Sequence, residues 1–176
     1  MTPLSIRPVQ RGDRDTIHWI VASTGNFSPV EVETALELVD AALAEGEASG
    51  YLVYLLEDAG LPVGYVCFGP TPLTQGTWDL YWIAVERSGQ GKGYGRHLLA
   101  YTEAEVRHRG GRLMLIETSS QESYGATVAF YERTGYDLVA RIPGFYRPGD
   151  DKLIYAKELE PEPREGGGAD GADVEH

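Results

Sequence analysis

The segment from Gly89 to Arg96 constrains the fold of this chain more than any other. It holds four glycines in eight residues, and it lies between an apolar run, Trp78 to Val85, and a segment with helical spacing that reaches Arg109. A glycine-rich turn between a strand and a helix presents free backbone N–H groups and the positive end of the helix dipole. The sequence therefore predicts an anion-binding loop in a protein that mixes strands and helices.

Two common phosphate-binding motifs do not fit this loop. A dinucleotide fingerprint, G-x-G-x-x-G, requires glycine where the chain has Tyr94 or Arg96, depending on the glycine from which it is counted. A P-loop requires Ser or Thr after the Gly-Lys pair, and here Gly93 follows Lys92. A nucleotide-binding regulator is therefore disfavoured.

The apolar spacing along the chain predicts an α/β protein with a mixed, mostly antiparallel sheet of about seven strands flanked by about four helices. Asp13 is expected to cap a first helix, and Ser28, Pro29 and Glu31 form the capping box of a second. Strands are expected at 4–9, 51–57, 63–68, 78–85, 112–117, 136–142 and 152–159, and helices at 13–24, 28–46, 93–109 and 124–134.

A third pattern does fit the glycine loop, namely Gln90-x-x-Gly93-x-Gly95. A second motif, Phe130-Tyr131-Glu132-x-x-Gly135-Tyr136, follows some 35 residues later. Together with the apolar strand before the loop, these motifs resemble the GNAT superfamily of N-acetyltransferases, and most nearly its ribosomal-protein alanine branch. The resemblance extends over residues 4–159 in the order of elements. It implies a GNAT-like fold in one domain, residues 1–159, and an enzyme that uses acetyl-CoA.

The resemblance also implies where the donor binds. The family places the pyrophosphate on the loop amides and the pantetheine arm beside the preceding strand. The residues implied for the cofactor are Ile83, Ala84 and Val85 on the strand, and Gln90, Gly91, Lys92, Gly93, Tyr94, Gly95 and Arg96 in the loop. Lys92 and Arg96 either add positive charge near the phosphates or are solvated residues at the start of a helix.

Acetyl transfer to an amine needs a group that takes the amine proton and a group that protonates the departing thiolate. In the family motif Tyr131 is the proton donor, although it could instead be a packed aromatic. Glu117, at the end of a strand, is the candidate base, because partial burial there would raise its pKa. Asp79, Glu86 and water are the alternatives. Two features depart from the family: the interval from Glu117 to Tyr131 is two residues longer, and Tyr124 replaces a common Asn.

The resemblance places the acceptor amine near Phe27, Asp79, Tyr81 and Tyr146. Aromatic rings beside carboxylates suit an ammonium-bearing acceptor, although the same rings could simply pack together. The acceptor is expected to be a small-molecule amine or the N-terminal amine of a protein or peptide. The alternative to an enzyme is a non-catalytic acyl-CoA-binding module of the same fold, and a homodimer is possible.

The composition of the chain indicates which other partners, cofactors and locations to expect. Twenty-seven acids against 15 bases give a net charge of −12, which disfavours nucleic acid and anionic membranes. A single cysteine, Cys67, is expected to be buried, and the four histidines lack metal-ligand spacing, so no metal is expected. No apolar run suggests a signal peptide or a membrane span, so a cytoplasmic protein is expected. Residues 160–176 are acidic and rich in Gly and Pro, which predicts a disordered tail.

Overall fold

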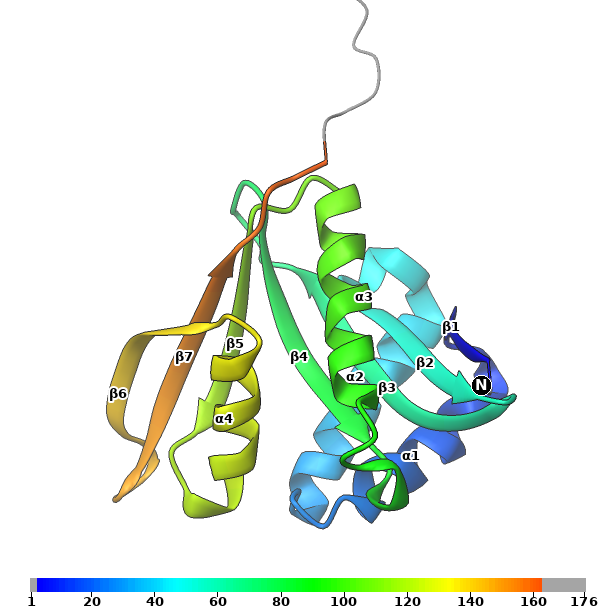
Figure 1. Ribbon diagram of the computed structural model, residues 1–176, viewed down its shortest axis with the longest axis horizontal. Helices are drawn as coiled ribbons and strands as arrows, with labels where there is room; N and C mark the ends of the chain where they lie inside the picture. The colour runs from blue at the N-terminus through cyan, green and yellow to red at the C-terminus, as the bar shows by residue number, and fades with distance from the viewer. Residues whose placement is uncertain (1–2, 163–176) are drawn as a thin grey trace, which may run out of the picture.

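The computed structural model describes residues 3–162 and contains one seven-stranded sheet flanked by helices (Figure 1). In space the strands run in the order β1-β2-β3-β4-β5-β7-β6. The strands are β1 (Leu4–Pro8), β2 (Leu52–Asp58), β3 (Leu61–Pro70), β4 (Thr77–Val85), β5 (Leu113–Ser119), β6 (Asp137–Arg147) and β7 (Asp150–Glu158). The α-helices are α1 (Arg14–Ser23), α2 (Pro29–Glu45), α3 (Tyr94–His108) and α4 (Gly125–Arg133).

The sheet is mixed and mostly antiparallel, as predicted. Among the described strands β4 and β5 form the one parallel pair, and every other neighbouring pair is antiparallel. The chain must return to the same end of the sheet between β4 and β5, and α3 makes that crossover. This connection places the glycine loop, which precedes α3, at the carboxyl end of β4.

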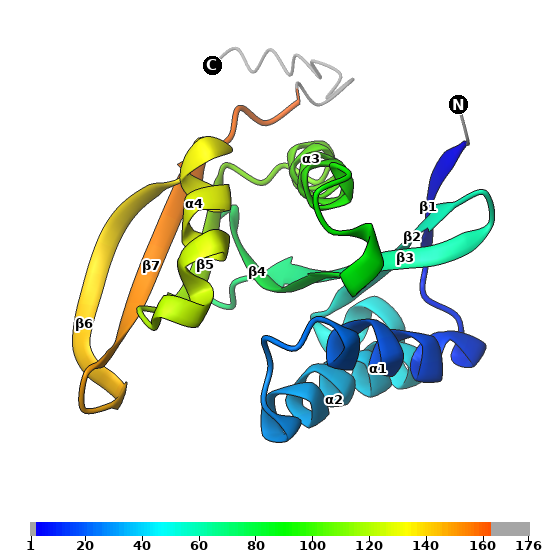
Figure 2. The same ribbon diagram turned by 60° about the horizontal axis from the view of Figure 1, so that its bottom comes forward.

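The helices cover both faces of the sheet (Figure 2). Helices α1 and α2 bury Ile17, Ile20 and Val39 against one face, on which Leu55 and Tyr65 lie. Helices α3 and α4 cover the other face with a separate apolar cluster. The predicted capping box at the start of α2 is confirmed: the Ser28 hydroxyl accepts from the Glu31 N–H, and the Glu31 carboxylate accepts from the Ser28 N–H.

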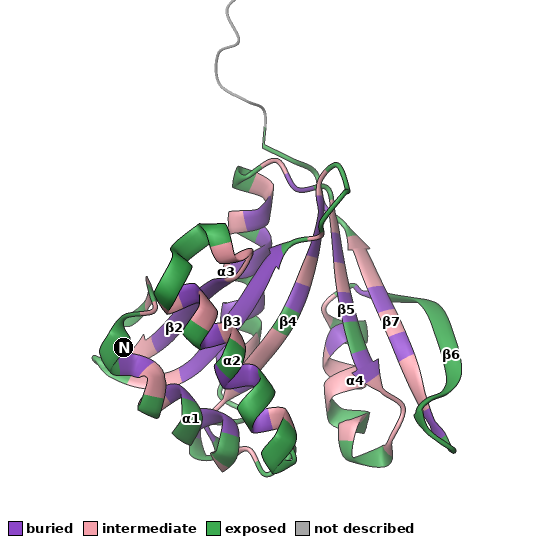
Figure 3. Cartoon of the chain, turned by 180° about the vertical axis from the view of Figure 1, so that it is seen from behind, coloured by how far each residue is buried: buried purple, intermediate pink, exposed green. Residues whose placement is uncertain are grey.

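Strand β6 is longer than predicted and is exposed along its whole length (Figure 3). It continues five residues beyond Ile142, to Arg147. The sequence predicts an end at Ile142 because the next residue is Pro143, and proline has no N–H to donate to a neighbouring strand. The structure accommodates it as an irregularity on an edge strand, where the Gly144 N–H donates to the Asp151 carboxylate instead.

The predicted tail lies mostly outside the described residues, since 163–176 are not described. Glu162, the last described residue, contacts the end of α3, where its N–H donates to the Arg107 carbonyl over 3.3 Å. Over residues 3–162, no helix combines the length and the apolar character needed to cross a bilayer.

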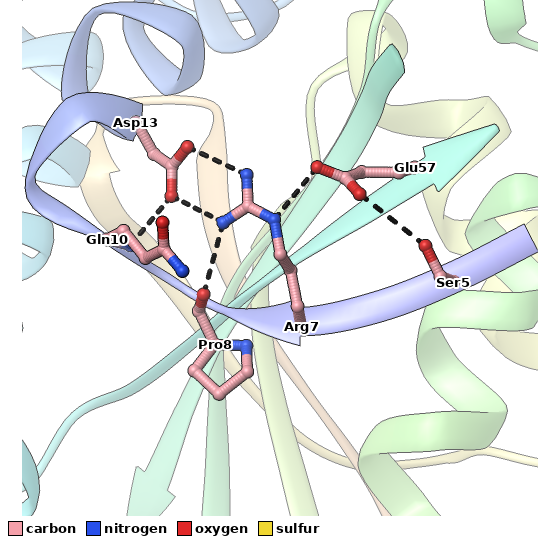
Figure 4. Close-up of polar contacts among 6 residues, drawn as sticks. All are labelled: Ser5, Arg7, Pro8, Gln10, Asp13 and Glu57. Atoms are coloured by element: carbon pink, nitrogen blue, oxygen red, sulfur yellow. Dashed lines mark hydrogen bonds and ion pairs between the residues drawn. The ribbon is translucent and has the colours of Figure 1, made fainter. Parts of the chain in front are cut away.

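Asp13 is the N-cap residue of α1, as expected, but its side chain makes no capping hydrogen bond to that helix. Its carboxylate accepts two hydrogen bonds from the Arg7 guanidinium, at 2.7 and 2.9 Å, and one from the Gln10 N–H at 2.7 Å (Figure 4). Arg7 also donates to Glu57 on β2. The side chain of Asp13 is only 12% exposed, so this pair fixes the start of α1 to strands β1 and β2.

We expect Asp13→Asn to lower the free energy of unfolding by about 2 kcal/mol, because it removes charged hydrogen bonds from a largely buried site. Arg7 holds the pKa of Asp13 below its ordinary value. Stabilisation by this carboxylate is therefore complete above its unfolded pKa, near 4, and is lost as the pH falls through the lower folded value. Urea unfolding between pH 7 and pH 3 measures both effects.

The matched control is Asp40→Asn, which breaks the exposed pair between Arg14 and Asp40. A solvent-exposed pair contributes little to stability. Equal losses in the two variants, or an acid dependence unchanged by Asp13→Asn, would contradict the assigned role of the Arg7–Asp13 pair.

Candidate active site

Strands β4 and β5 pair along only part of their length. The parallel ladder joins Thr77–Leu80 to residues 113–116 and ends there, although β4 continues to Val85 and β5 to Ser119. The two strands diverge beyond this point (Figure 2). The backbone of β4 after Leu80 therefore has no strand partner on its β5 side, and its polar groups on that edge are available to a ligand.

The cause of the split is an extra residue in β4. Cys67 of β3 pairs with Trp82, and the next residue, Phe68, pairs with Leu80, so that Tyr81 has no partner. A bulge of this kind bends the strand that carries it. The bulge occurs at the residue where β4 leaves β5, which explains the position of the opening.

A cleft of about 1280 Å³ occupies the opening. The glycine loop, β4, β5, α4, and the α1–α2 connection all contribute to its lining. Its volume exceeds the range typical of a site for one small ligand, which is roughly 300–1,000 Å³. The cleft is therefore large enough for a donor and an acceptor together.

The glycine loop forms one end of this cleft. Gly91 and Gly93 have φ of +81° and +86°, a conformation that residues with a Cβ rarely adopt, and Gly93 is the N-cap residue of α3. Gly93 therefore turns the chain into the helix with unpaired N–H groups at its first turn. An anion in the cleft could accept hydrogen bonds from them.

Of the ten residues predicted to bind the cofactor, Lys92 alone does not line the cleft. Arg96 does line it and is exposed. The Tyr94 side chain is buried in the core, and its hydroxyl donates to the Asp58 carboxylate, so this residue can offer the donor its backbone but not its ring. Gln90 donates a long hydrogen bond, 3.5 Å, to the Val85 carbonyl.

Tyr131 lies on α4 and also lines the cleft. Its ring packs among Phe130, Tyr136 and Tyr155, with centroids 5.5 to 6.4 Å apart, so the residue is both a packed aromatic and a wall of the cleft. Burial raises the pKa of its phenol well above the ordinary value. The hydroxyl therefore keeps its proton at neutral pH.

The three carboxylates that are candidates for the base differ in their exposure and in their hydrogen-bond partners. Glu117 is the first residue of β5 beyond the paired segment and lines the cleft, but its side chain is 49% exposed and lies 2.6 Å from Lys152 Nζ. The partial burial expected for it is therefore not found. Asp79 lines the cleft and accepts from the Thr71 hydroxyl at 2.6 Å. Glu86 is buried and accepts from the N–H and hydroxyl of Ser88, so it caps the loop.

All four residues expected around the acceptor line the cleft, namely Phe27, Asp79, Tyr81 and Tyr146. Phe27 packs edge-on against Trp82 with centroids 5.1 Å apart. Burial, with a smaller contribution from Asp79, raises the pKa of Tyr81 to about 12. Cys67 is buried, as expected, and burial raises the pKa of its thiol to about 12.

Two polar residues of the cleft are not indicated as such by the sequence. The spacing assigns Glu31 only to a helix cap, and Tyr124 is only a departure from the family pattern. Both line the cleft, as does Asp150. Residues 3–162 contain no group of three or more His, Cys, Asp or Glu arranged to hold a metal ion, and the expectation that no metal is used stays a prediction.

A parallel strand pair splits beside the helix-capping glycine loop, and a buried tyrosine lines the resulting cleft, which is the arrangement that the resemblance to the GNAT family implies. Residues 15–136 match the model of the acetyltransferase (GNAT) family. A Desulfovibrio desulfuricans protein described as a GNAT-family acetyltransferase is 45% identical, with 89% of this chain and 99% of that chain covered and a TM-score of 0.86. The chain belongs to the GNAT family of acetyltransferases.

Other relatives are more distant. Blasticidin-S acetyltransferase of Streptomyces morookaense is 38% identical over 82 residues, which is 46% of this chain and 55% of that protein, so the match spans about half of each. The Escherichia coli ribosomal-protein-S18-alanine N-acetyltransferase is 20% identical with a TM-score of 0.73 and coverage of 93% and 98%. A Salmonella typhimurium structure described with its cofactor acetyl-CoA is 23% identical with a TM-score of 0.69 and coverage of 90% and 95%. The last two show the fold alone, so the ribosomal-protein branch is one neighbour among several.

Proposed function

We propose that this acetyltransferase moves the acetyl group of acetyl-CoA to a primary amine by direct attack within a ternary complex. The observation that carries the proposal is the split between β4 and β5. The split forms one cleft that is lined by the glycine loop before α3, by the buried Tyr131 and by Glu117. The alternative, a non-catalytic acyl-CoA-binding module, would need the loop but neither Tyr131 nor Glu117.

The donor fits the loop end of the cleft. The pyrophosphate would accept hydrogen bonds from the N–H groups at the start of α3, and Arg96 would add positive charge. The pantetheine amides would pair with the free edge of β4 from Tyr81 to Val85, in the manner of an added strand. This arrangement needs no side chain from Lys92 or Tyr94, in agreement with the positions found for both.

Acetyl-CoA would supply an activated thioester. The amine nitrogen would bond to the acetyl carbonyl carbon, the bond from that carbon to sulfur would break, and its electron pair would leave with sulfur. A backbone N–H near Val85 would stabilise the developing oxyanion. Tyr131 would donate its hydrogen bond to the sulfur. Because burial raises its pKa above that of an ordinary thiol, Tyr131 is a weak acid, and we infer that it acts mainly by hydrogen bonding to the thiolate.

For the proton released by the amine, Glu117 is better placed than its two rivals. It follows directly after the paired segment of β5 and so borders the opening, whereas Glu86 caps the loop and Asp79 lies in the paired segment. The Lys152 ammonium occupies one of its oxygens. A water molecule relaying the proton to Glu117 is compatible with the exposure of its side chain.

The acceptor would enter beside Glu31, Asp79, Glu117 and Asp150, which line the cleft together with aromatic rings. Two of these carboxylates have a cationic partner, Asp150 with Arg147 at 3.7 Å and Glu117 with Lys152 at 2.6 Å, whereas Glu31 and Asp79 accept hydrogen bonds from hydroxyl groups. The carboxylates without a cationic partner favour an acceptor that carries positive charge, as an alkylamine or a peptide N-terminus does.

Thermal unfolding with acetyl-CoA, beside NAD and ATP, tests the donor. At a hundredfold excess over Kd the ligand should stabilise the protein by about 2.7 kcal/mol, and the two nucleotides should not. Release of free CoA thiol, measured with a panel of primary amines and with their N-acetylated forms as controls, tests the transfer. Stabilisation without amine-dependent thiol release from any amine would favour the non-catalytic module, and no stabilisation would contradict the donor.

A further inference from the structure

The cleft lies between two parts of the described chain, which we call lobes and which share one apolar cluster with α3. The first lobe comprises residues 3–85, with β1 to β4, α1 and α2, and the second comprises residues 112–162, with β5 to β7 and α4. At one end the lobes are joined by the four-residue ladder between β4 and β5 and by a hydrogen bond of 2.7 Å from Arg112 Nε to the Gln75 carbonyl. Beyond the ladder the strands separate (Figure 2).

A second connection crosses the open end of the cleft. The Tyr124 hydroxyl, just before α4 in the second lobe, lies 2.9 Å from Glu31 Oε1 and 3.4 Å from the Asn26 carbonyl in the first lobe. Apart from the bond between Arg112 and Gln75, these are the only side-chain hydrogen bonds that join the two lobes over residues 3–162. All three residues line the cleft.

The electrostatic state of the pair makes this contact strong. Burial, and then the nearby Glu31 carboxylate, raises the pKa of Tyr124, so the phenol stays protonated. Burial alone would raise the pKa of Glu31, but hydrogen bonds from Ser28 and Tyr124 hold it below its ordinary value. The bond therefore joins a neutral donor to an ionised acceptor, and Glu31 is itself fixed by the capping box of α2.

We propose that Tyr124 and Glu31 form a latch that holds the two lobes together across the cleft and sets the size of the amine that reaches the donor. On the first lobe, the latch residue Glu31 lies next to the segment between α1 and α2. That segment is on the face of the sheet opposite α3 and its glycine loop (Figure 2). It therefore borders the acceptor's side of the cleft, next to Phe27. Both residues are positioning residues, because they act through the width of the opening and not on the reacting atoms.

The test compares Tyr124→Phe with Tyr155→Phe. The control removes a similar tyrosine–glutamate hydrogen bond, from the Tyr155 hydroxyl to Glu132 at 3.2 Å, but both of its partners lie within the second lobe. We expect Tyr124→Phe to raise the ratio of kcat/KM for a bulky amine to that for a small amine about tenfold, as expected for loss of one charged hydrogen bond. Acetyl-CoA binding should be unchanged, and Tyr155→Phe should leave the ratio at the wild-type value.

The inference about acceptor size rests on the proposed function, so a second measurement is independent of activity. Amide hydrogen exchange in residues 24–31 and 120–127 should quicken in Tyr124→Phe and not in Tyr155→Phe, because two facing segments lose their connection. If the wild type transfers acetyl to no amine, the proposed function fails and exchange alone tests the latch. Unchanged exchange in Tyr124→Phe, or equal changes in both variants, overturns it.

Glu31→Gln provides a further test, because Gln also serves at the third position of a capping box and should keep α2 intact. If the two residues act together, Glu31→Gln and the double variant should shift the amine ratio no further than Tyr124→Phe alone. Additive shifts would show that the residues act separately and would overturn the latch.

Discussion

Replacing Tyr131 with phenylalanine is expected to lower kcat about a hundredfold, the lower end of the range for loss of one hydrogen-bond donor to a developing negative charge. The substitution removes one oxygen from a ring held by Phe130, Tyr136 and Tyr155, so the wall of the cleft should persist. Acetyl-CoA should therefore bind as it does to the wild type. Steady-state release of CoA thiol, together with calorimetric titration of acetyl-CoA, separates turnover from binding.

The pH profile provides a second check on the same residue. Because burial raises the pKa of Tyr131 well above the ordinary value for tyrosine, ionisation of this phenol should cause no loss of activity up to about pH 10. Tyr155→Phe again serves as the control. Equal turnover by Tyr131→Phe and the wild type would show that Tyr131 is only a packed aromatic.

Replacing Gly93 with valine is expected to weaken acetyl-CoA binding at least tenfold. At φ of +86° a β-branched residue is strained by roughly 1–3 kcal/mol, and relief of that strain moves the N–H groups at the start of α3. Apart from the residues next to it in the chain, nothing lies within 4 Å of where the new Cβ would be, so the substitution acts through the backbone and through the space that the donor needs. Titration calorimetry with acetyl-CoA measures the loss.

Gly60→Val is the matched control for this substitution. Gly60 has φ of +80° and an equally open Cβ position, but it lies in the turn between β2 and β3 and does not line the cleft. It should lower the thermal midpoint about as much as Gly93→Val while binding acetyl-CoA normally. Equal binding by both variants would mean that the loop geometry at Gly93 does not matter to the donor.

Local sequence patterns were sufficient for most of the fold and for the donor end of the cleft. The capping box at Ser28 and Glu31, the apolar runs of β2 and β3 on either side of a short turn, and the glycine loop before α3 each depend on residues a few positions apart. Interactions of this range are set by backbone conformation and can be read from spacing. The loop therefore lies where the sequence predicts it, between β4 and α3, and the roles of its residues in donor binding stay predictions. The structure adds that the Tyr94 ring is buried, with its hydroxyl bonded to Asp58, and that Lys92 does not line the cleft.

Only the tertiary structure decided where the cleft opens and which side chains meet in it. The bulge at Tyr81 depends on the register between β3 and β4, which spacing in one strand does not encode. Lys152 reaches Glu117 from β7. Tyr124 and Glu31 lie 93 positions apart in the chain. Side-chain pairs so distant in sequence meet only after strands have found their partners, and their geometry follows from the packing of whole elements. The sequence by itself thus determined the family's fold and the position of the glycine loop, and the tertiary structure determined which carboxylates and tyrosines line the cleft.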